Sequence, residues 1–247
     1  MKRTILSIVV LMAAISAMAQ TWKVVKTDGS VVRFPASSVN YVTVEAEDYE
    51  YVDLGLPSGT LWATRNIGAD NPEDFGDYFA WGETATKYYY DWSSYKWCNG
   101  SETTITKYCS MSSNGYNGFT DNLTELLPED DAAYVNWGSD WRMPTITQFE
   151  ELLKNSYTTT EWTTKNGVYG RKITSKTNGN SIFLPAAGAR NDGSLGDAGS
   201  RGHYWSRTLN TSSPDKARRL YFNSSGIYTS YYSTRFSGIS VRPVRAQ

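Results

Sequence analysis

The stretch RRLYFNSSGIYTSYYSTRFSGISVRPVR, residues 218–245, carries the pattern from which the fold is predicted. Its first residues alternate: in a strand, Leu220 and Phe222 would face one side of a sheet, and Tyr221 and Asn223 the other. Asn, Ser and Gly residues then end this strand, and a polar segment rich in tyrosine follows. The stretch ends with GISVRPV, which reads as another short strand. The pattern predicts short strands joined by turns, with one buried and one solvent-facing side.

Similar short apolar runs, bounded by Gly, Asn, Asp or Ser, occur earlier in GLPSGTLWAT, GDYFAWGE, KTNGNSIFLPAAG and HYWSRT. The clearest helix signal is PTITQFEELLKNS, where Thr145 and Gln148 have the spacing of a capping box. A shorter helix is predicted in EDDAAYVNWG, capped by Asp130 or Asp131, with Val135 packed beside two alanines. Two helices among irregular strands predict a loop-rich α+β domain rather than a sandwich.

The first nineteen residues, MKRTILSIVVLMAAISAMA, have the organisation of a signal peptide. Lys2 and Arg3 precede an apolar run, and an A-x-A cleavage site ends just before Gln20. The apolar run is shorter than the roughly 20 residues that span a bilayer, and no cysteine follows it as a lipid anchor. We expect cleavage to leave no transmembrane segment and the mature chain to be secreted to the periplasm, the cell surface or the exterior.

Three segments follow the predicted signal peptide. Residues 20–44 are predicted to form an N-terminal β ribbon, with a hairpin turn at Asp28-Gly29 and a third strand in VNYVTVE. Residues 45–50, EAEDYE, are an acidic linker. The main domain is expected to occupy residues 51–247.

Charge and cysteine content limit the classes of partner and chemistry. Lysine and arginine total 24 against 25 acidic residues, a formal net charge of −1. Because no basic surface is indicated, nucleic acid is not expected as a partner. In an exported protein, Cys98 and Cys109 are expected to form a disulfide across the Asn99-Gly100 turn. The alternative, a reactive thiol pair, has no adjacent histidine or basic cluster to stabilise a thiolate.

Six motifs together resemble a known family: YVDLGLPSGTLWAT, NPEDFGDYFAWGE, EDDAAYVNWGSDWRMPT, NSIFLPAAG, YWS and GISVRPV. They are similar, in order and over about residues 51–245, to the Fibrobacter succinogenes major paralogous domain of secreted bacterial proteins. The resemblance implies a C-type-lectin-like fold, related to formylglycine-generating enzymes and to the variable proteins of diversity-generating retroelements. That fold would have a twisted, mostly antiparallel sheet, two helices and long ordered loops. The motif tryptophans, by their apolar or Gly-flanked contexts, are expected in the core: Trp62, Trp81, Trp137, Trp141 and Trp205.

The resemblance also implies that the ligand-facing surface lies near the C-terminus, over residues 204–235. Tyrosine gives large contact area at low entropic cost, while serine, asparagine and arginine supply adaptable or bidentate hydrogen bonds. Such residues would also suit a retroelement-diversified segment. The alternative is that they simply cover an exposed antiparallel sheet. The residues predicted to point to solvent and bind the ligand are Arg207, Asn210, Asp215, Arg219, Tyr221, Asn223, Tyr228, Tyr231, Tyr232 and Arg235.

Enzymatic and metal chemistry find little support in the sequence. No cysteine follows Cys109, whereas the formylglycine-generating relatives need a cysteine pair in that region, and the single histidine, His203, cannot build a multi-histidine metal site. His203 is expected at the surface or hydrogen-bonded. Carboxylates cluster near Asp74, Asp130 and Asp192, but none of these clusters has the sequence signature of a calcium-binding loop. No metal or cofactor is therefore predicted, and a structural calcium ion is the alternative.

The Gly-rich run DGSLGDAGSRG, residues 192–202, is expected to be a long surface loop. With no catalytic residue identified, the sequence predicts a secreted or surface-exposed, non-enzymatic binding protein whose partner is a glycan or a protein. The competing hypotheses are a formylglycine-generating-like oxidoreductase and a purely structural surface module.

Overall fold

The computed structural model of the chain describes residues 21–25, 31–35 and 49–246. The chain divides into two compact units, Met1–Glu47 and Asp48–Gln247. This division falls inside residues 45–50, the predicted acidic linker. The predicted signal peptide, the Asp28-Gly29 turn and the predicted third strand of the ribbon lie outside the described residues.

The first unit contains an antiparallel strand pair. β1 (Thr21–Val25) pairs with β2 (Val31–Pro35) in continuous register, with Thr21 opposite Pro35 and Val25 opposite Val31. The alternating sequence on either side of Asp28-Gly29 predicts such a pair.

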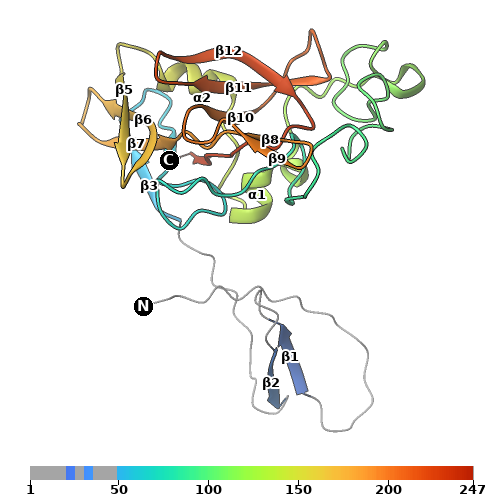
Figure 1. The fold of residues 1–247 in the computed structure, drawn as a ribbon, viewed down its shortest axis with the longest axis horizontal. Coiled ribbons are helices and arrows are strands. Elements are labelled where there is room, and N and C mark those ends of the chain that lie inside the picture. Colours follow the sequence, from blue (N-terminus) through green and yellow to red (C-terminus); the bar gives the residue numbers. More distant parts are fainter. Residues whose placement is uncertain (1–20, 26–30, 36–48, 247) are drawn as a thin grey trace. The chain divides into compact units, whose positions relative to one another are not determined.

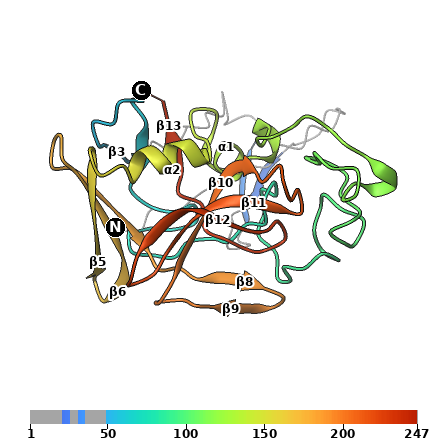
Figure 2. The same cartoon turned by 90° about the horizontal axis from the view of Figure 1, so that it is seen from above.

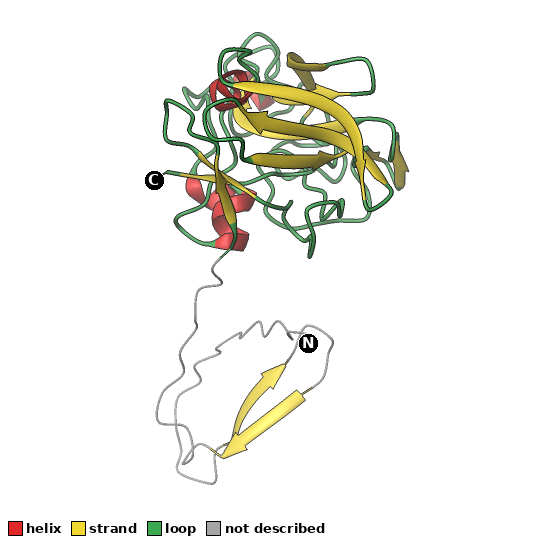
Figure 3. Cartoon of the chain, turned by 90° about the vertical axis from the view of Figure 1, so that its left-hand side faces the viewer, coloured by secondary structure: helices red, strands yellow, loops and turns green. Residues whose placement is uncertain are grey.

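The second unit is built from several small antiparallel sheets joined by long loops (Figure 1). Helices are few and short, and most of the chain between strands is loop, as Figure 3 shows. The described sheets of this unit have the strand orders β13-β4-β3, β5-β6-β7, β10-β11-β12 and β8-β9. Their strands are β3 (Tyr51–Asp53), β4 (Leu61–Ala63), β5 (Thr158–Lys165), β6 (Val168–Ser175), β7 (Ser181–Pro185), β8 (Ala189–Asn191), β9 (Ser194–Gly196), β10 (Gly202–Leu209), β11 (Lys216–Phe222), β12 (Ile227–Thr234) and β13 (Val244–Arg245).

These sheets and the two α-helices confirm an α+β class. The expectation that residues 192–202 form a loop is wrong in part, because β9 lies within this run and pairs with β8, with Ser194 opposite Asn191. A two-residue turn at Asp192-Gly193 makes the pairing feasible, and Asp192 has a positive φ of 50° that asparagine and aspartate tolerate.

Both predicted helices are present and are capped as the sequence predicts. In α2 (Ile146–Leu152), the Thr145 side chain accepts from the Gln148 backbone N–H and the Gln148 side chain accepts from the Thr145 backbone. In α1 (Ala132–Trp137), the Asp131 carboxylate accepts from the second and third helical N–H groups. Val135 is exposed, contrary to the expectation that it packs, because it lies across this short helix from the buried Ala133. Two 3₁₀ turns, η2 (Tyr116–Gly118) and η3 (Pro128–Asp130), precede α1.

The core is aromatic, as predicted. All five motif tryptophans are buried, and Trp81 and Trp205 also donate their indole N–H groups to backbone carbonyls of Ser206 and Phe79. Arg242 is fully buried and ties its own segment to two others by donating to the carbonyls of Ala63 and Thr64 and to that of Phe183. A buried arginine with several carbonyl acceptors fixes loop backbones that have no sheet partner.

The C-terminal sheet, β10-β11-β12, has two differently covered sides. Leu220 and Phe222 of β11 pack in one apolar cluster with Phe149 and Leu152 of α2. Figure 2 shows α2 on one side of this sheet and the β8–β9 hairpin toward the other. Because successive strand residues alternate in direction, the side chain of Tyr221, between Leu220 and Phe222, points away from α2.

Candidate functional site

The face of the C-terminal sheet that points away from α2 carries two cross-strand rows of side chains. Directly opposite residues on neighbouring strands point to the same face, so each row is a set of neighbours. From β10 through β11 to β12 the rows are Trp205–Arg219–Tyr231 and His203–Tyr221–Tyr228.

Three tyrosines of these rows form a ring cluster, which we call the tyrosine cluster: Tyr221, Tyr228 and Tyr231. The ring centroid of Tyr221 lies 4.8 Å from that of Tyr231 and 6.2 Å from that of Tyr228, and the last two are 5.7 Å apart. Tyr228 and Tyr231 are 42% and 43% exposed. Tyr221 is half-buried between them. The cluster therefore offers aromatic surface and phenol hydroxyls to solvent at a single place.

A buried arginine and histidine lie against the tyrosine cluster. The guanidinium carbon of Arg219 is 5.2 Å from the ring centroid of Tyr221 and 5.8 Å from that of Tyr231. His203 lies beside Tyr221, with ring centroids 5.3 Å apart, and its Nδ1 contacts Nη1 of Arg219. Arg219 and His203 are only 8% and 7% exposed. The cluster thus combines open aromatic surface with a largely enclosed cation.

The environment changes the acid–base properties of this pair. Burial, followed by the neighbouring charges of Arg219 and Arg201, lowers the pKa of His203 to about 3. Burial also lowers the pKa of Arg219 to about 10. At neutral pH the histidine is therefore neutral and the arginine charged.

A tight turn holds the end of the cluster where β11 meets β12. The Asn223 side-chain oxygen accepts from the backbone N–H groups of Ser225 and Gly226, and its amide nitrogen donates to the Tyr221 hydroxyl, 3.2 Å away. Arg171 of β6 donates to the Asn223 carbonyl at 2.8 Å. Asn223, a predicted ligand-binding residue, therefore positions Tyr221 and the turn.

Of the ten residues predicted to point to solvent, three are buried in the structure. Arg219 is on the predicted outward face but is buried, because Trp205 and Tyr231 flank it in its row. Asp215 is also buried, with its carboxylate 2.7 Å from the Lys216 ammonium. Arg235 is the third and the most completely enclosed.

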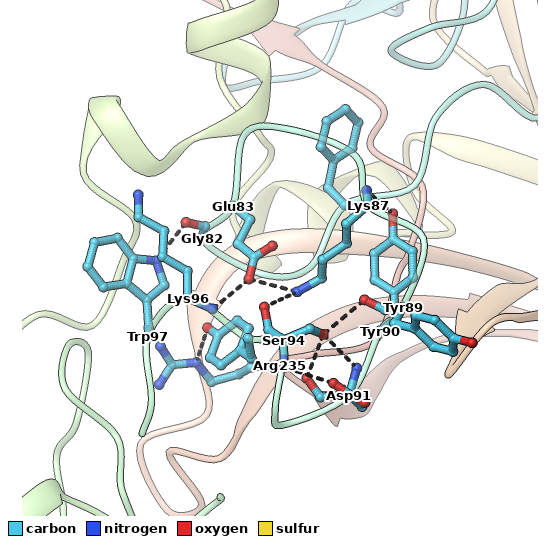
Figure 4. Close-up of polar contacts among 12 residues, drawn as sticks. Gly82, Glu83, Lys87, Tyr89, Tyr90, Asp91, Ser94, Lys96, Trp97 and Arg235 are labelled. Carbon is cyan, nitrogen blue, oxygen red and sulfur yellow. Dashed lines mark hydrogen bonds and ion pairs between the residues drawn. The ribbon is translucent and has the colours of Figure 1, made fainter. Parts of the chain in front are cut away.

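Arg235 is a structural residue and not part of the exposed face. It has no exposed surface, and its guanidinium donates to the Tyr95 hydroxyl at 2.8 Å and to the carbonyls of Tyr108, Pro214 and Lys107. Figure 4 shows it reaching into the loops that contain Gly82, Glu83 and Trp97. It lies just past β12, where the chain turns inward and strand alternation no longer applies.

These loops are held by their own polar contacts. The Glu83 carboxylate accepts from the Lys87 ammonium at 2.9 Å and from the Lys96 backbone N–H at 2.8 Å, while Trp97 donates to the Gly82 carbonyl (Figure 4). Hydrogen bonds from the Ser94 hydroxyl and, second, from the Ser94 backbone N–H lower the pKa of the Asp91 carboxyl. The polar groups of this region are paired with one another, which indicates a structural role.

The remaining predicted residues do not join the tyrosine cluster. Tyr232, 49% exposed, follows Tyr231 and so points to the opposite face, where the Lys216 ammonium is 5.9 Å from its ring centroid. Arg207 pairs with Glu125 at 2.9 Å. Asn210 accepts from the Ser212 backbone in a turn. Of the ten predicted residues, the structure brings together Arg219, Tyr221, Asn223, Tyr228 and Tyr231.

Another aromatic surface is not among the residues predicted from the sequence. Tyr88 and Tyr89 are strongly exposed, their rings meet edge to face with centroids 4.8 Å apart, and both lie beside Gly193 at the tip of the β8–β9 hairpin. The run KYYYDW is the signal that could have revealed them, since three consecutive tyrosines cannot all be buried by one local element.

The predicted bridge between Cys98 and Cys109 is not formed in the structure. Both are free thiols and they are not near each other. The backbone of Cys98 forms an isolated β-bridge with Ile105, and the Cys98 thiol lies 3.2 Å from the Trp92 carbonyl. The backbone N–H of Cys109, by contrast, donates to the Asp121 carboxylate. The segment between them folds back locally, which carries the two thiols to different neighbours. Burial raises the pKa of both thiols.

Two hollows lie near the sheets. One, of about 510 Å³, is lined by strands β5 to β7 and includes Glu161, Lys165 and Lys172. Its charges are balanced, since Glu161 is directly opposite Lys172 and Lys165 lies 4.0 Å from Glu73. The other, of about 380 Å³, is lined by Glu150 and Leu153 and by the start of β12, and it borders the tyrosine cluster at Tyr228.

Among the described residues, no group of three or more His, Cys, Asp or Glu side chains is placed to hold a metal ion. In the same part of the chain, no helix has the length and apolar character needed to cross a membrane.

Residues 144–244 match a family model described as a domain of unknown function (DUF8237). The matched segment contains α2 and the whole C-terminal sheet. No curated protein and no solved structure matches the chain.

Proposed function

We propose that this chain is an exported, non-enzymatic binding protein that recognises a glycan through the tyrosine cluster of its C-terminal sheet. The observation that carries the proposal is the gathering of Tyr221, Tyr228 and Tyr231, exposed and in mutual contact, over a buried cation. An exposed group of large side chains on a soluble domain commonly marks a recognition surface.

The size and chemistry of the cluster favour a sugar. A tyrosine ring presents a flat apolar face with a polar tip, and it loses little conformational entropy on binding. Such faces suit the C–H surface of a pyranose ring, while the phenol groups suit the hydroxyls of the sugar. A stable protein interface buries about 800 Å² on each partner, far more than three partly exposed rings provide.

The fold we propose for the second unit is C-type-lectin-like, of the Fibrobacter succinogenes major paralogous type. Its antiparallel sheets, two capped helices, long ordered loops and tryptophan core agree with that proposal. Fold alone does not establish a ligand, so the proposed activity depends on the cluster. The signal-peptide pattern of residues 1–19 supports export.

A glycan array tests this function. The full mature chain should bind a subset of glycans, and the triple variant Tyr221→Ala, Tyr228→Ala, Tyr231→Ala should lose them. Tyr232→Ala is the matched control, since this tyrosine is on the same strand and equally exposed but faces the other side. Retained binding in a folded triple variant would exclude the cluster as the site. An array without signal, together with capture of a protein ligand that depends on the same tyrosines, would replace the glycan by a protein partner.

A further inference from the structure

Arg219 is a buried cation without a counter-ion in the described part of the chain. Its described polar partner is the neutral His203, and its Nε is buried without any hydrogen-bond acceptor. Leaving a buried charge unpaired destabilises the folded chain. By contrast, Arg235 and Arg242, which are fully buried, have their guanidinium groups surrounded by oxygen acceptors.

His203 adds a second unmet group at the same place. Its Nδ1 faces the Arg219 guanidinium, which can only donate, so Nδ1 accepts and the ring proton resides on Nε2. Nε2 is buried and has no partner. Both unmet atoms, Nε of Arg219 and Nε2 of His203, are therefore N–H donors, and the site as a whole is positively charged.

An acceptor-only anion satisfies all of these groups together. A carboxylate offers two oxygens in the planar spacing that an arginine fork matches. Tyr221 and Tyr231 are the side chains that lie over the guanidinium, and both remain partly exposed. A carboxylate that reaches Arg219 must therefore displace one of these rings.

We propose that the tyrosine cluster selects acidic sugars, with the sugar carboxylate bound by Arg219 and His203 and the pyranose ring against the tyrosines. This inference rests on the proposed glycan-binding function and specifies its ligand class. A charge-assisted hydrogen bond contributes more than a neutral one, about 1.5–3 kcal/mol, or roughly a tenfold to hundredfold gain in affinity.

The test uses two sugars that differ at one carbon. Glucuronate carries a carboxylate where glucose carries a hydroxymethyl group, and titration of the full mature chain followed by NMR should give tighter binding of glucuronate by about tenfold or more. Arg219→Gln should remove this preference. Arg218→Gln, the adjacent arginine on the opposite face of β11, should keep it.

Each other outcome has a distinct meaning. Equal binding of the two sugars, lost in the triple tyrosine variant, overturns the carboxylate inference and leaves the glycan function standing. If N-acetylglutamate binds as tightly as glucuronate, the site recognises the carboxylate of an acidic peptide, and the inference that it selects acidic sugars is overturned. If Arg219→Gln does not fold, the comparison of ligands on the unaltered chain still decides, and binding of neither sugar overturns the inference.

Discussion

Tyr228 and Tyr231 are three residues apart on one strand, yet their rings meet on the same face with centroids 5.7 Å apart. In a regular strand, residues separated by three point to opposite faces. Here Tyr228 is opposite Tyr221 and Tyr231 is opposite Arg219. Between these two pairs, β12 therefore advances by three residues while β11 advances by two. The extra residue is a β-bulge, a feature that often redirects side chains next to functional sites.

Gly226 controls where the Tyr228 ring lies. A Cβ at this position would come 2.2 Å from the Tyr228 hydroxyl oxygen. Because that oxygen is the free end of a flexible side chain, Gly226→Ala should displace the ring at a cost of less than about 1 kcal/mol in unfolding free energy. We expect glycan binding to weaken while thermal melting changes little. Ser225→Ala, in the same turn, is the control and should affect neither; unchanged binding in Gly226→Ala would show that Tyr228 is dispensable.

Local signals in the sequence predicted local structure well. Each of these signals involves residues within a few positions of one another. The structure confirms the capping box at Thr145, the cap at Asp131 and the burial of Leu220 and Phe222 on one face of their strand. The tryptophan core was predictable because large apolar rings have few alternatives to burial.

The arrangement of the candidate site could not be predicted in the same way. Whether Arg219 is exposed depends on Trp205 and Tyr231, which belong to other strands, and the bulge in β12 has no sequence signature. Alternation also stops at the end of a strand, so it gave no information about Arg235. Burial of these groups is decided by pairing register and loop paths, which involve residues far apart in the chain.

Arg235 should be essential for stability and not for recognition. Substitution by methionine removes four hydrogen bonds and leaves buried carbonyls without donors, at about 1–3 kcal/mol for each unsatisfied group. We expect a loss of about 3 kcal/mol or more in chemical denaturation, and a melting temperature lower by about 6–12 °C. Arg207→Met breaks a partly exposed ion pair and should cost less than about 1 kcal/mol. Similar losses for both variants would contradict the structural role of Arg235.

The two cysteines should behave as separate thiols. The intact, unreduced mature chain should accept two alkyl groups when denatured in the presence of iodoacetamide, and mass spectrometry counts them. In the folded chain alkylation should be slow, because burial raises the pKa of both thiols and so reduces the reactive thiolate. A mass two hydrogens lighter than the reduced chain, with no alkylation, would instead establish the Cys98–Cys109 disulfide predicted from the sequence.

His203 should make stability depend on pH in acid. Its folded pKa is lowered to about 3 from an ordinary value of 6.5, so between these values the unfolded chain binds a proton that the folded chain does not. Stability from this residue is therefore complete above about pH 6.5 and falls as the pH drops towards 3, by at most about 1.4 kcal/mol per pH unit.

The variant His203→Gln isolates this contribution, since glutamine keeps an acceptor for Arg219 but does not titrate. Urea unfolding from pH 4 to pH 7, in a buffer free of carboxylates, should show a steeper rise in stability for the native chain than for the variant. Subtracting the two curves removes the effects of other groups, such as Asp131, whose pKa burial raises. Parallel curves would mean that His203 is solvated in solution and that Arg219 is not enclosed as the structure has it, which would also remove the basis for carboxylate recognition.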